Sequence, residues 1–382
     1  MTLSVLVVDD SVVIRRLVTT VLDADPDITV LGTAANGRIA LAKIEQLRPD
    51  LVTLDIEMPE MDGLETLRQL RRTDTRLPVV MFSTLTERAA KATLEALALG
   101  ADDYVTKPAN VGSVAAGMEA VRTQLVPKIK ALCAGRASTG AARVPAARRP
   151  VAPPARTSPA PAAPPPADGP ARAALPPQVL AIGCSTGGPE ALGSVLRALP
   201  AALPVPVVVV QHMPPVFTTM FAQRLDSQCA LRVREAQDGD RLEPGLVLIA
   251  PGDFHLTVAR PGPAAVARLD QSAQENWCRP AVDRLFRSVA EVYGAAALAL
   301  VLTGMGHDGL LGAGRLREAG APVLVQDAAT STVWGMPGAI ANAGLASAVL
   351  PLPQVAPALL SALSTRTGAL SARPSVAPGG SR

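Results

Sequence analysis

Short apolar runs alternate with amphipathic stretches through the first 130 residues of the chain. Continuous apolar runs of this length are typical of strands buried on both faces of a sheet, and the stretches between them have helical spacing. Repeated strand–helix units favour a parallel sheet with helices on both faces. The predicted strands cover 3–8, 28–33, 51–55, 78–82 and 103–106, and the predicted helices cover 12–24, 36–47, 63–72, 87–99 and 111–130.

The same alternation returns after residue 178 and predicts a second parallel α/β unit. Residues 229–270 depart from it, because short strands separated by Gly and Pro turns predict a hairpin excursion from the main sheet. The predicted strands cover 179–183, 205–210, 246–250, 297–303 and 322–325, and the predicted helices cover 189–199, 214–227, 280–292, 309–319 and 353–364.

Between the two units, residues 133–177 hold twelve prolines, and six arginines against one aspartate. Such a composition buries too little apolar surface to fold and predicts an extended spacer. The fold class is therefore α/β, with two doubly wound parallel-sheet domains. We place the first domain at 1–130, the disordered linker at 131–177, the second domain at 178–364 and a disordered tail at 365–382.

The net charge of +3 arises from this spacer and from residues 364–382, which hold three arginines and no acid. The remaining residues are acidic in balance, so we expect no nucleic-acid binding. The four cysteines form no C-x-x-C pair, which argues against a zinc site or a disulfide framework and favours a reducing compartment. No apolar run approaches the ~20 residues of a membrane helix. These features predict a cytoplasmic protein without membrane insertion.

In the first domain, charged and hydroxyl side chains follow four of the predicted strands. These residues are Asp9 and Asp10, Asp55, Ser83 and Lys107. Each acid alone is better explained as a helix cap. The carboxyl ends of parallel strands meet at one edge, however, so the combination predicts a site there. Clustered carboxylates favour Mg²⁺, and a carboxylate can accept a phosphoryl group, with lysine and hydroxyl binding its oxygens.

In the second domain, Ser185 lies in a Gly-x-Ser-x-Gly segment where a buried strand turns into a helix. Alone this is weak, because Gly-rich turns also bind phosphate or merely reverse the chain. His212 and Asp308 each follow another apolar strand, and could serve as general base and orienting acid. His212 could instead be a capped loop histidine. The order Ser, His, Asp differs from that of α/β-hydrolases.

Two neighbours of these residues are weaker candidates. His307 precedes Asp308, and adjacent side chains diverge, so Asp308 is better placed to orient His212. Cys184 is an alternative nucleophile to Ser185. By the same argument, however, its side chain points away from the site, and we interpret it as a small buried side chain that fills space in the core.

The segments VLVVDDS, LVTLDIEMPEMDG, VVMFST and YVTKP resemble the response-regulator receiver family, whose fold is flavodoxin-like. The resemblance implies that Asp55 is phosphorylated by a histidine kinase. It also implies that Asp10, Asp55 and the backbone carbonyl of Glu57 hold Mg²⁺, with Asp9 acting through water. Ser83 and Lys107 would contact the phosphoryl group, and Tyr104 would be a rotating switch.

The segments IGCSTGGPEAL, QHMPPVFT, APGDFHL, ENWCRPAVDRLFRS, LTGMGHDG and QDAATSTVWGMPGA resemble the protein-glutamate methylesterases of bacterial chemotaxis. The resemblance implies hydrolysis of glutamate γ-methyl esters on methyl-accepting chemotaxis receptors, together with deamidation of receptor glutamines. Ser185 would be the nucleophile, His212 the base and Asp308 its orienter, with backbone amides of Thr186 and Met305 as the oxyanion hole. The ester chemistry would need no cofactor, and we expect a monomer.

Two other functions stay open. One is a receiver-gated serine hydrolase acting in a non-flagellar chemosensory pathway. The other is a signalling scaffold without activity, against which the complete Ser, His and Asp set argues. In the enzyme readings we expect the unphosphorylated receiver to cover the Ser185 cleft. Phosphorylation of Asp55 would then move it away.

Overall fold

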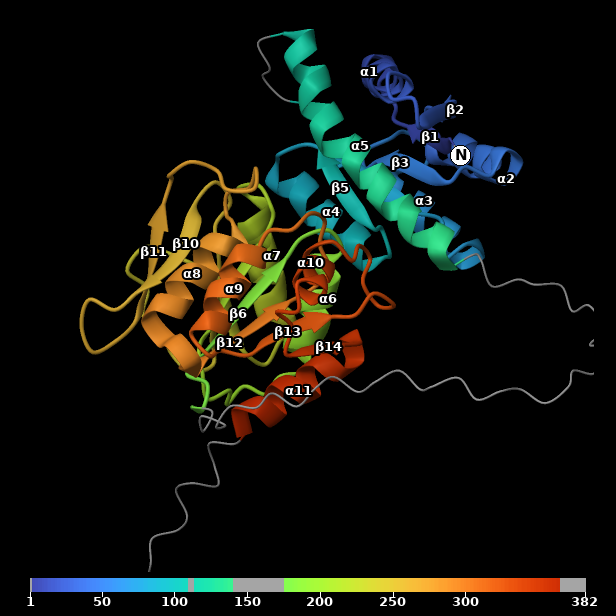
Figure 1. Cartoon of the computed structure of the whole chain (residues 1–382). Coiled ribbons are helices and arrows are strands. Elements are labelled where there is room, and N and C mark those ends of the chain that lie inside the picture. The colour runs from blue at the N-terminus through green and yellow to red at the C-terminus, as the bar shows by residue number, and fades with distance from the viewer. Residues whose placement is uncertain (1, 109–112, 140–174, 365–382) are drawn as a thin grey trace, which may run out of the picture.

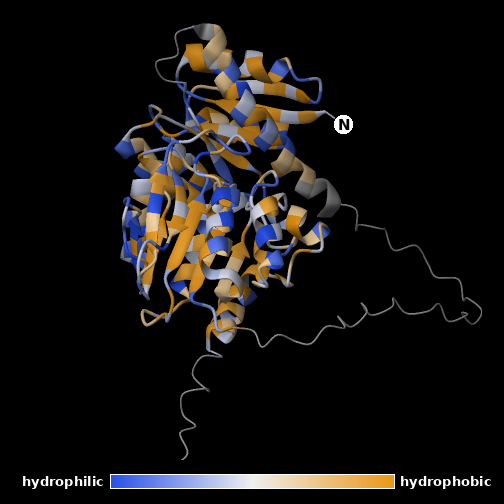
Figure 2. Ribbon diagram, turned by 60° about the vertical axis from the view of Figure 1, so that its left-hand side comes forward, coloured by the Kyte–Doolittle hydropathy of each residue, from blue (hydrophilic) through white to orange (hydrophobic). Residues whose placement is uncertain are grey.

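The computed structural model describes residues 2–108, 113–139 and 175–364. Residues 140–174 of the predicted linker and the predicted tail lie outside the described residues. The described residues form two α/β units, each built around its own parallel sheet (Figure 1). Hydrophobic residues run along the strands of both sheets, and polar residues cover the outer helix faces (Figure 2).

The first unit has a five-stranded sheet with the strand order β2-β1-β3-β4-β5, parallel throughout. This is the doubly wound order whose functional site lies at the carboxyl ends of the strands. Strands β3 and β4 are buried along their whole length, as their mainly apolar sequences predict. The elements are β1 Leu3–Val8, α1 Val12–Asp23, β2 Ile28–Ala34, α2 Gly37–Leu47, β3 Leu51–Asp55, α3 Gly63–Thr73, β4 Val79–Ser83, α4 Glu87–Ala98, β5 Asp103–Thr106 and α5 Val114–Thr139.

Helix α5 extends beyond residue 130, where the sequence placed the end of the first domain. Leu132 and Cys133 are buried in the same apolar cluster as Leu125 and Ile129, on the sheet face that α5 covers. Burial of these side chains stabilises the additional helical turns, although the local composition resembles the spacer. The predicted start of the linker at residue 131 therefore falls inside a helix.

The second unit has a seven-stranded sheet with the order β14-β13-β12-β6-β7-β9-β8, again parallel in every pair. Its elements are β6 Val179–Cys184, α6 Gly188–Arg197, β7 Val207–Gln211, α7 Phe217–Gln228, β8 Arg232–Glu235, β9 Leu246–Ile249, β10 His255–Ala259, β11 Val266–Asp270, α8 Val282–Tyr293, the 3₁₀ turn η2 Gly294–Ala296, β12 Ala297–Val301, α9 Leu310–Glu318, β13 Val323–Gln326, α10 Met336–Asn342, β14 Ala348–Leu350 and α11 Leu352–Ser364. The two-domain α/β fold predicted from the sequence is confirmed.

The segment that leaves the main sheet is shorter than the predicted range 229–270. Strands β10 and β11 form an antiparallel pair outside the main sheet, as predicted. Strand β8 instead pairs in parallel with β9 and forms an edge of the main sheet, because Val233 is buried in the core there. The short elements α10 and β14 were not predicted, since neither carries enough periodic sequence to show a pattern.

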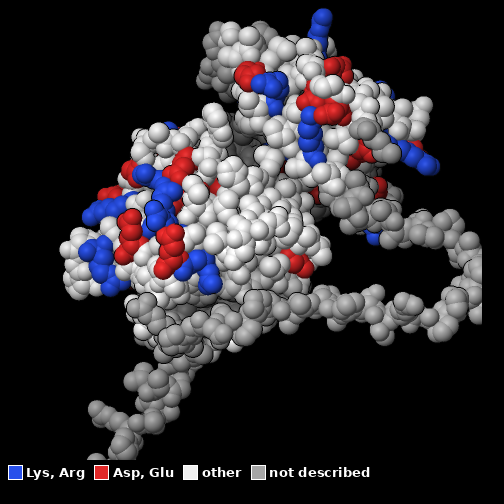
Figure 3. All heavy atoms as spheres, in the orientation of Figure 1, with Lys and Arg blue, Asp and Glu red and all other residues white. Residues whose placement is uncertain are grey.

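Helix α4 of the first unit packs against α6 and α7 of the second. One apolar cluster contains buried residues of both units, so the contact between them continues a hydrophobic core. On the face drawn in Figure 3, positive and negative side chains are intermixed on both units, without a continuous basic surface. None of the described helices is both long and apolar enough to span a bilayer.

Candidate functional sites

Three strand ends of the first unit converge on a buried ion-pair cluster. Lys107 Nζ lies 2.8 Å from Asp9 Oδ2 and 2.7 Å from Asp55 Oδ2. Asp9 and Asp55 are almost fully buried, whereas Asp10 beside them is exposed. The doubly wound fold thus brings together the acids and the lysine that the sequence singled out.

The electrostatics of this cluster favour an added cation. Burial, the largest effect, and the negative charge of Asp9 raise the pKa of Asp55 to about 6, although Lys107 opposes them. Burial alone would lower the pKa of Lys107, but its bonds to Asp55 and Asp9 outweigh burial and raise it. Lys107 therefore stays charged, and its single charge only partly offsets the carboxylates around it.

The donor set fits a hard divalent cation. One carboxylate oxygen from each of Asp9, Asp10 and Asp55 lies within 4.8 Å of the others. Asp9 Oδ2 is buried and accepts no hydrogen bond, although Lys107 Nζ lies 2.8 Å away as an ion-pair partner. An oxygen in this state is available to a metal or to a metal-bound water. Glu57 lines an open pocket next to Asp10, on the exposed side of the cluster.

The predicted switch residues lie in different surroundings. The Ser83 hydroxyl accepts a hydrogen bond from Thr93 Oγ1 at 2.8 Å and is buried. The Tyr104 ring is also buried, and it stacks on Phe217 of α7 with a centroid distance of 4.8 Å and an interplanar angle of 4°. Lys128 Nζ lies over the Tyr104 ring, 5.3 Å from its centroid. Tyr104 is thus part of the contact with the second unit.

In the second unit, Ser185 lies at the turn from β6 into α6. The turn is tight because Gly187 has a φ of +72°, which residues with a side chain rarely adopt. A Cβ at Gly187 would also lie 2.3 Å from Thr332 Oγ1. Ser185 N–H donates to Thr303 O at 3.1 Å, which fixes the turn to the end of the neighbouring strand β12. The Ser185 side chain is partly exposed.

His212 follows β7, the neighbour of β6, and its ring is held by Asp308. Cys184 pairs with Gln211 in the sheet register, so Ser185 and His212 are the next residues along their strands. The Gln211 amide spans the two strand ends and donates to Ser185 O at 3.0 Å. His212 Nε2 lies 2.8 Å from Asp308 Oδ2. The structure thus brings the three predicted catalytic residues to one edge of the sheet.

Asp308 is a buried carboxylate held by several donors. Its oxygens accept from Val282 N–H at 2.7 Å, Asp283 N–H at 3.0 Å and Asn276 Nδ2 at 2.9 Å, besides the contact with His212. The first two donors belong to the first turn of α8, whose dipole also favours negative charge. Burial opposes ionisation, but His212 and these donors outweigh it and lower the pKa of Asp308 to about 2.

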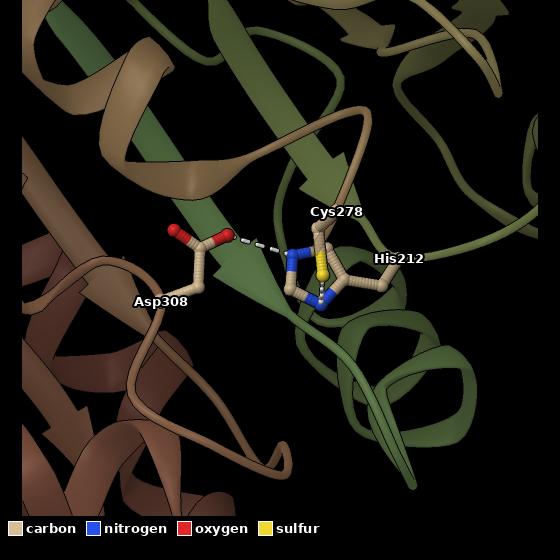
Figure 4. Close-up of side chains that lie close together, drawn as sticks. All are labelled: His212, Cys278 and Asp308. Atoms are coloured by element: carbon tan, nitrogen blue, oxygen red, sulfur yellow. Dashed lines mark hydrogen bonds and ion pairs between the residues drawn. The ribbon is translucent and has the colours of Figure 1, made fainter. Parts of the chain in front are cut away.

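The second nitrogen of His212 faces a cysteine that the sequence did not single out. Cys278 Sγ lies 3.7 Å from Nδ1, whereas Asp308 contacts the other ring nitrogen, Nε2 (Figure 4). Burial would lower the pKa of His212, but the charge of Cys278 and the hydrogen bond to Asp308 outweigh burial and raise it. Among the described residues, no hydrogen bond joins the Ser185 hydroxyl to His212.

The backbone beside Ser185 offers unpaired donors. In the described part of the chain, neither Thr186 N–H nor Met305 N–H donates a hydrogen bond. Gly304, which precedes Met305, runs so close to Ser185 that a Cβ on it would lie 3.0 Å from Ser185 Cβ. Two free amides next to a partly exposed serine are the arrangement that an oxyanion hole requires.

The first unit contacts the second at the residue next to Ser185. Thr186 Oγ1 donates to Asp103 Oδ2 of β5 at 2.6 Å, and both side chains are buried. The other oxygen of Asp103 pairs with Lys128 Nζ at 2.9 Å. Met305 and Val333 also pack against the apolar cluster of the first unit. A residue with a predicted oxyanion-hole amide is therefore bound by the domain that carries Asp55.

The structure agrees with the interpretation of His307 and Cys184 as residues outside the candidate site. His307 is exposed, and Cys184 is fully buried, with a pKa raised by burial. The third histidine, His255, is a core residue that accepts from Ala281 N–H at 3.2 Å.

Sequence reasoning missed Asn276, Cys278 and Asp103. The first two share a turn that precedes α8 and lies far from Ser185 along the chain. Their only sequence signal is the segment ENWCRPAVD, whose polar residues precede an amphipathic helix. Asp103 begins a predicted strand and carries no signal of its own in the sequence, because its role depends on how the domains dock.

Comparison with known proteins identifies both units. A family described as "CheB methylesterase" matches residues 180–359, and one described as "Response regulator receiver domain" matches residues 5–118. A protein-glutamate methylesterase/protein-glutamine glutaminase of Nocardioides sp. is 55% identical, over 98% of both chains. One from Trichodesmium erythraeum is 50% identical over 92% of this chain and 96% of its own. The solved Thermotoga maritima CheB methylesterase catalytic domain is 43% identical over 49% of this chain and 99% of its own, with a TM-score of 0.48.

Proposed function

The chain belongs to the family of receiver-containing protein-glutamate methylesterases/protein-glutamine glutaminases, and we propose that it acts on methyl-accepting chemotaxis receptors. It hydrolyses glutamate γ-methyl esters and deamidates glutamines on these receptors, and so serves adaptation in chemotaxis. The observation that carries the proposal is the contact of His212 with Asp308 at the strand end beside Ser185. With its four free cysteines, the enzyme works in a reducing cytoplasm.

The reaction we propose is acyl transfer through Ser185. When the ester is bound, the Ser185 hydroxyl turns to His212 Nδ1, which is the ring nitrogen that Asp308 leaves free. His212 takes the hydroxyl proton while Oγ attacks the ester carbonyl, and the amides of Thr186 and Met305 bind the oxyanion. His212 then protonates the leaving methanol, or ammonia from a glutamine. Water hydrolyses the acyl-enzyme by the same steps in reverse.

Asp308 and Ser185 would use different nitrogens of the His212 ring. Asp308 accepts from Nε2–H, so it keeps Nδ1 unprotonated and stabilises the imidazolium that forms during attack. The structure supports this role because three other donors already fix the carboxylate in place. The ester chemistry therefore proceeds through side chains and backbone amides of this chain.

For the receiver we propose regulation by phosphorylation of Asp55. Asp10, Asp55 and the carbonyl of Glu57 would hold Mg²⁺, with Asp9 acting through water, and Lys107 and Ser83 would bind the phosphoryl oxygens. The bound Mg²⁺ would neutralise charge on the transferring phosphoryl group. A chemotaxis histidine kinase is the phosphodonor, consistent with the matched receiver domain.

Two of the contacts between the receiver and the esterase involve residues at or next to the two sites. Asp103 binds Thr186, and Tyr104 stacks on Phe217. We propose that phosphorylation draws Tyr104 inward toward Ser83 and breaks both contacts. The unphosphorylated receiver then acts as an inhibitor, because it binds Thr186 next to Ser185 and would obstruct the receptor there.

Asp55→Asn should abolish activation by a small acyl phosphate. In wild type we expect methanol release from methylated receptor to rise about tenfold, within the usual range of coupling between two sites. Chelation of Mg²⁺ should remove the same rise. The control is Asp50→Asn, at the opposite end of the same strand, where the carboxylate binds Ser4 N–H. A response that persists in Asp55→Asn, or is lost in Asp50→Asn, would contradict the assignment.

Asp103→Ala should raise the activity of the unphosphorylated enzyme. It removes a buried, charge-assisted hydrogen bond to Thr186, whose loss shifts the docking equilibrium by about tenfold. The measurement is methanol release without phosphodonor. Asp102→Ala is the control, since the Asp102 carboxylate binds Val79 N–H within the receiver. Equal or lower activity in Asp103→Ala than in wild type would show that this contact does not inhibit.

A further inference from the structure

Cys278 lies in a rigid turn beside the catalytic histidine. The turn is closed by hydrogen bonds from Glu275 N–H to Cys278 O at 3.1 Å and from Cys278 N–H to Glu275 O at 2.9 Å. The two residues between them have positive φ angles, 52° at Asn276 and 63° at Trp277, which is costly for residues with a side chain. Asn276 ties the turn to Asp308, so the position of the sulfur is fixed relative to the triad.

The turn is anchored to the body of the domain as well. Glu275 makes a two-pronged ion pair with Arg287 of α8, with distances of 2.6 and 2.5 Å. Within this fixed frame, Trp277 is 93% exposed and leaves the adjacent Cys278 partly accessible. The thiol can therefore be reached by a small reagent while its neighbours stay ordered.

The sulfur contacts the nitrogen on which the esterase depends. Cys278 Sγ lies 3.7 Å from His212 Nδ1, and Asp308 binds Nε2 (Figure 4). Cys278, His212 and Asp308 thus form the chain of contacts that activates a cysteine nucleophile. Burial would lower the pKa of His212, and the contact with Cys278 is among the causes that raise it instead.

The other three cysteines lack this environment. Cys184 is fully buried and Cys133 is buried under α5. Cys229 is partly exposed like Cys278, but no histidine contacts it, and burial raises the pKa of its thiol. Cys278 is therefore the thiol in the described residues that combines access with a base.

Building on the proposed esterase function, we propose that Cys278 is an oxidation site at which hydroperoxides switch the enzyme off. His212 Nδ1 takes the thiol proton while the sulfur of Cys278 attacks one peroxide oxygen, so an S–O bond forms and the O–O bond breaks. The leaving oxygen takes that proton from His212 and departs as water from hydrogen peroxide, or as an alcohol from an organic hydroperoxide, so sulfur is oxidised to sulfenic acid and peroxide is reduced.

The sulfenic acid blocks catalysis through its position. Its hydroxyl donates to Nδ1 and occupies the lone pair that would take the proton of Ser185. A small thiol reverses the change: it displaces water to form a mixed disulfide, and a second thiol then releases Cys278 as the free thiol. Receptor demethylation would thereby respond to peroxide separately from phosphorylation of Asp55.

The experiment uses the full-length chain. A chelator is present throughout, because ligand atoms of His212, Cys278 and Asp308 lie within 4.8 Å of one another and could hold a metal ion. Wild type, Cys278→Ser and Cys229→Ser are each treated with hydrogen peroxide, and each is compared with its own untreated sample. We expect wild type and Cys229→Ser to lose methanol release by at least about tenfold and to recover with dithiothreitol, while Cys278→Ser loses less than about twofold. A sulfenic-acid probe such as dimedone should label the Cys278 peptide.

Labelling separates failure of this proposal from failure of the proposed function. If untreated wild type released no methanol from methylated receptor, the esterase assignment would fail, yet dimedone at Cys278 would still report oxidation. Equal peroxide sensitivity of wild type and Cys278→Ser would overturn the inference. So would a wild type that keeps its activity and acquires no label at Cys278.

Discussion

Ser185→Ala should lower kcat for methanol release by about 10⁵-fold or more, since removal of the nucleophile from a serine triad leaves only binding and the oxyanion hole. The change removes one oxygen at a partly exposed turn, so the melting temperature should stay close to that of wild type. Methanol released from methylated receptor, measured under single-turnover conditions, gives the rate. Wild type should also accumulate an acyl-enzyme that the variant lacks.

The adjacent cysteine provides the control for this prediction. Cys184→Ala alters a fully buried side chain that points away from the cleft, and we expect kcat within about threefold of wild type. A Ser185→Ala protein that still restored receptor adaptation would favour a scaffold rather than an enzyme. If Cys184→Ala lost activity as completely as Ser185→Ala, the assignment of Ser185 as the nucleophile would be contradicted.

The parts of both sites that lie at strand ends could be predicted from sequence. Asp55, Ser185 and His212 each follow a continuous apolar strand, and the rule that parallel strands end at one edge places their side chains together without further information. The alternation of apolar strands with amphipathic helices predicted the two-sheet architecture. Residues that reach a site from outside the main sheet were not predicted, because no periodic pattern in the sequence relates them to that site.

Cys278 and Asp103 illustrate the two ways in which this reasoning fails. Cys278 lies in a turn whose path depends on backbone conformations with positive φ, and hydrophobic patterning does not specify these. Asp103 matters through a contact with Thr186 of the other domain. Domain docking depends on the shapes of both surfaces, so neither domain's own pattern contains it. The end of α5 was also misplaced, because buried side chains overrode local composition.

Asp308→Asn should lower kcat by about 10⁴-fold, the effect of losing the orienting carboxylate of a serine triad. The pKa of Asp308 near 2 keeps it negatively charged throughout the neutral range, and this charge holds Nε2–H of His212. An amide there carries no charge. Its NH₂ group would face backbone donors of α8 if its oxygen accepted from His212. The imidazolium is then less stable, and His212 can adopt the tautomer that cannot accept from Ser185.

Asp283→Asn distinguishes this role from general damage to the same cluster. Asp283 is also fully buried and shares Asn276 with Asp308, but it accepts from Gly312 N–H at 2.6 Å and does not bind His212. Both variants should lose stability by about 1–3 kcal/mol, because each leaves a buried donor without its acceptor. Only Asp308→Asn should lose most of kcat, and its residual rate should rise with pH as His212 loses its proton. Similar kcat values for the two variants would show that Asp308 supports the fold of this cluster and does not orient the base.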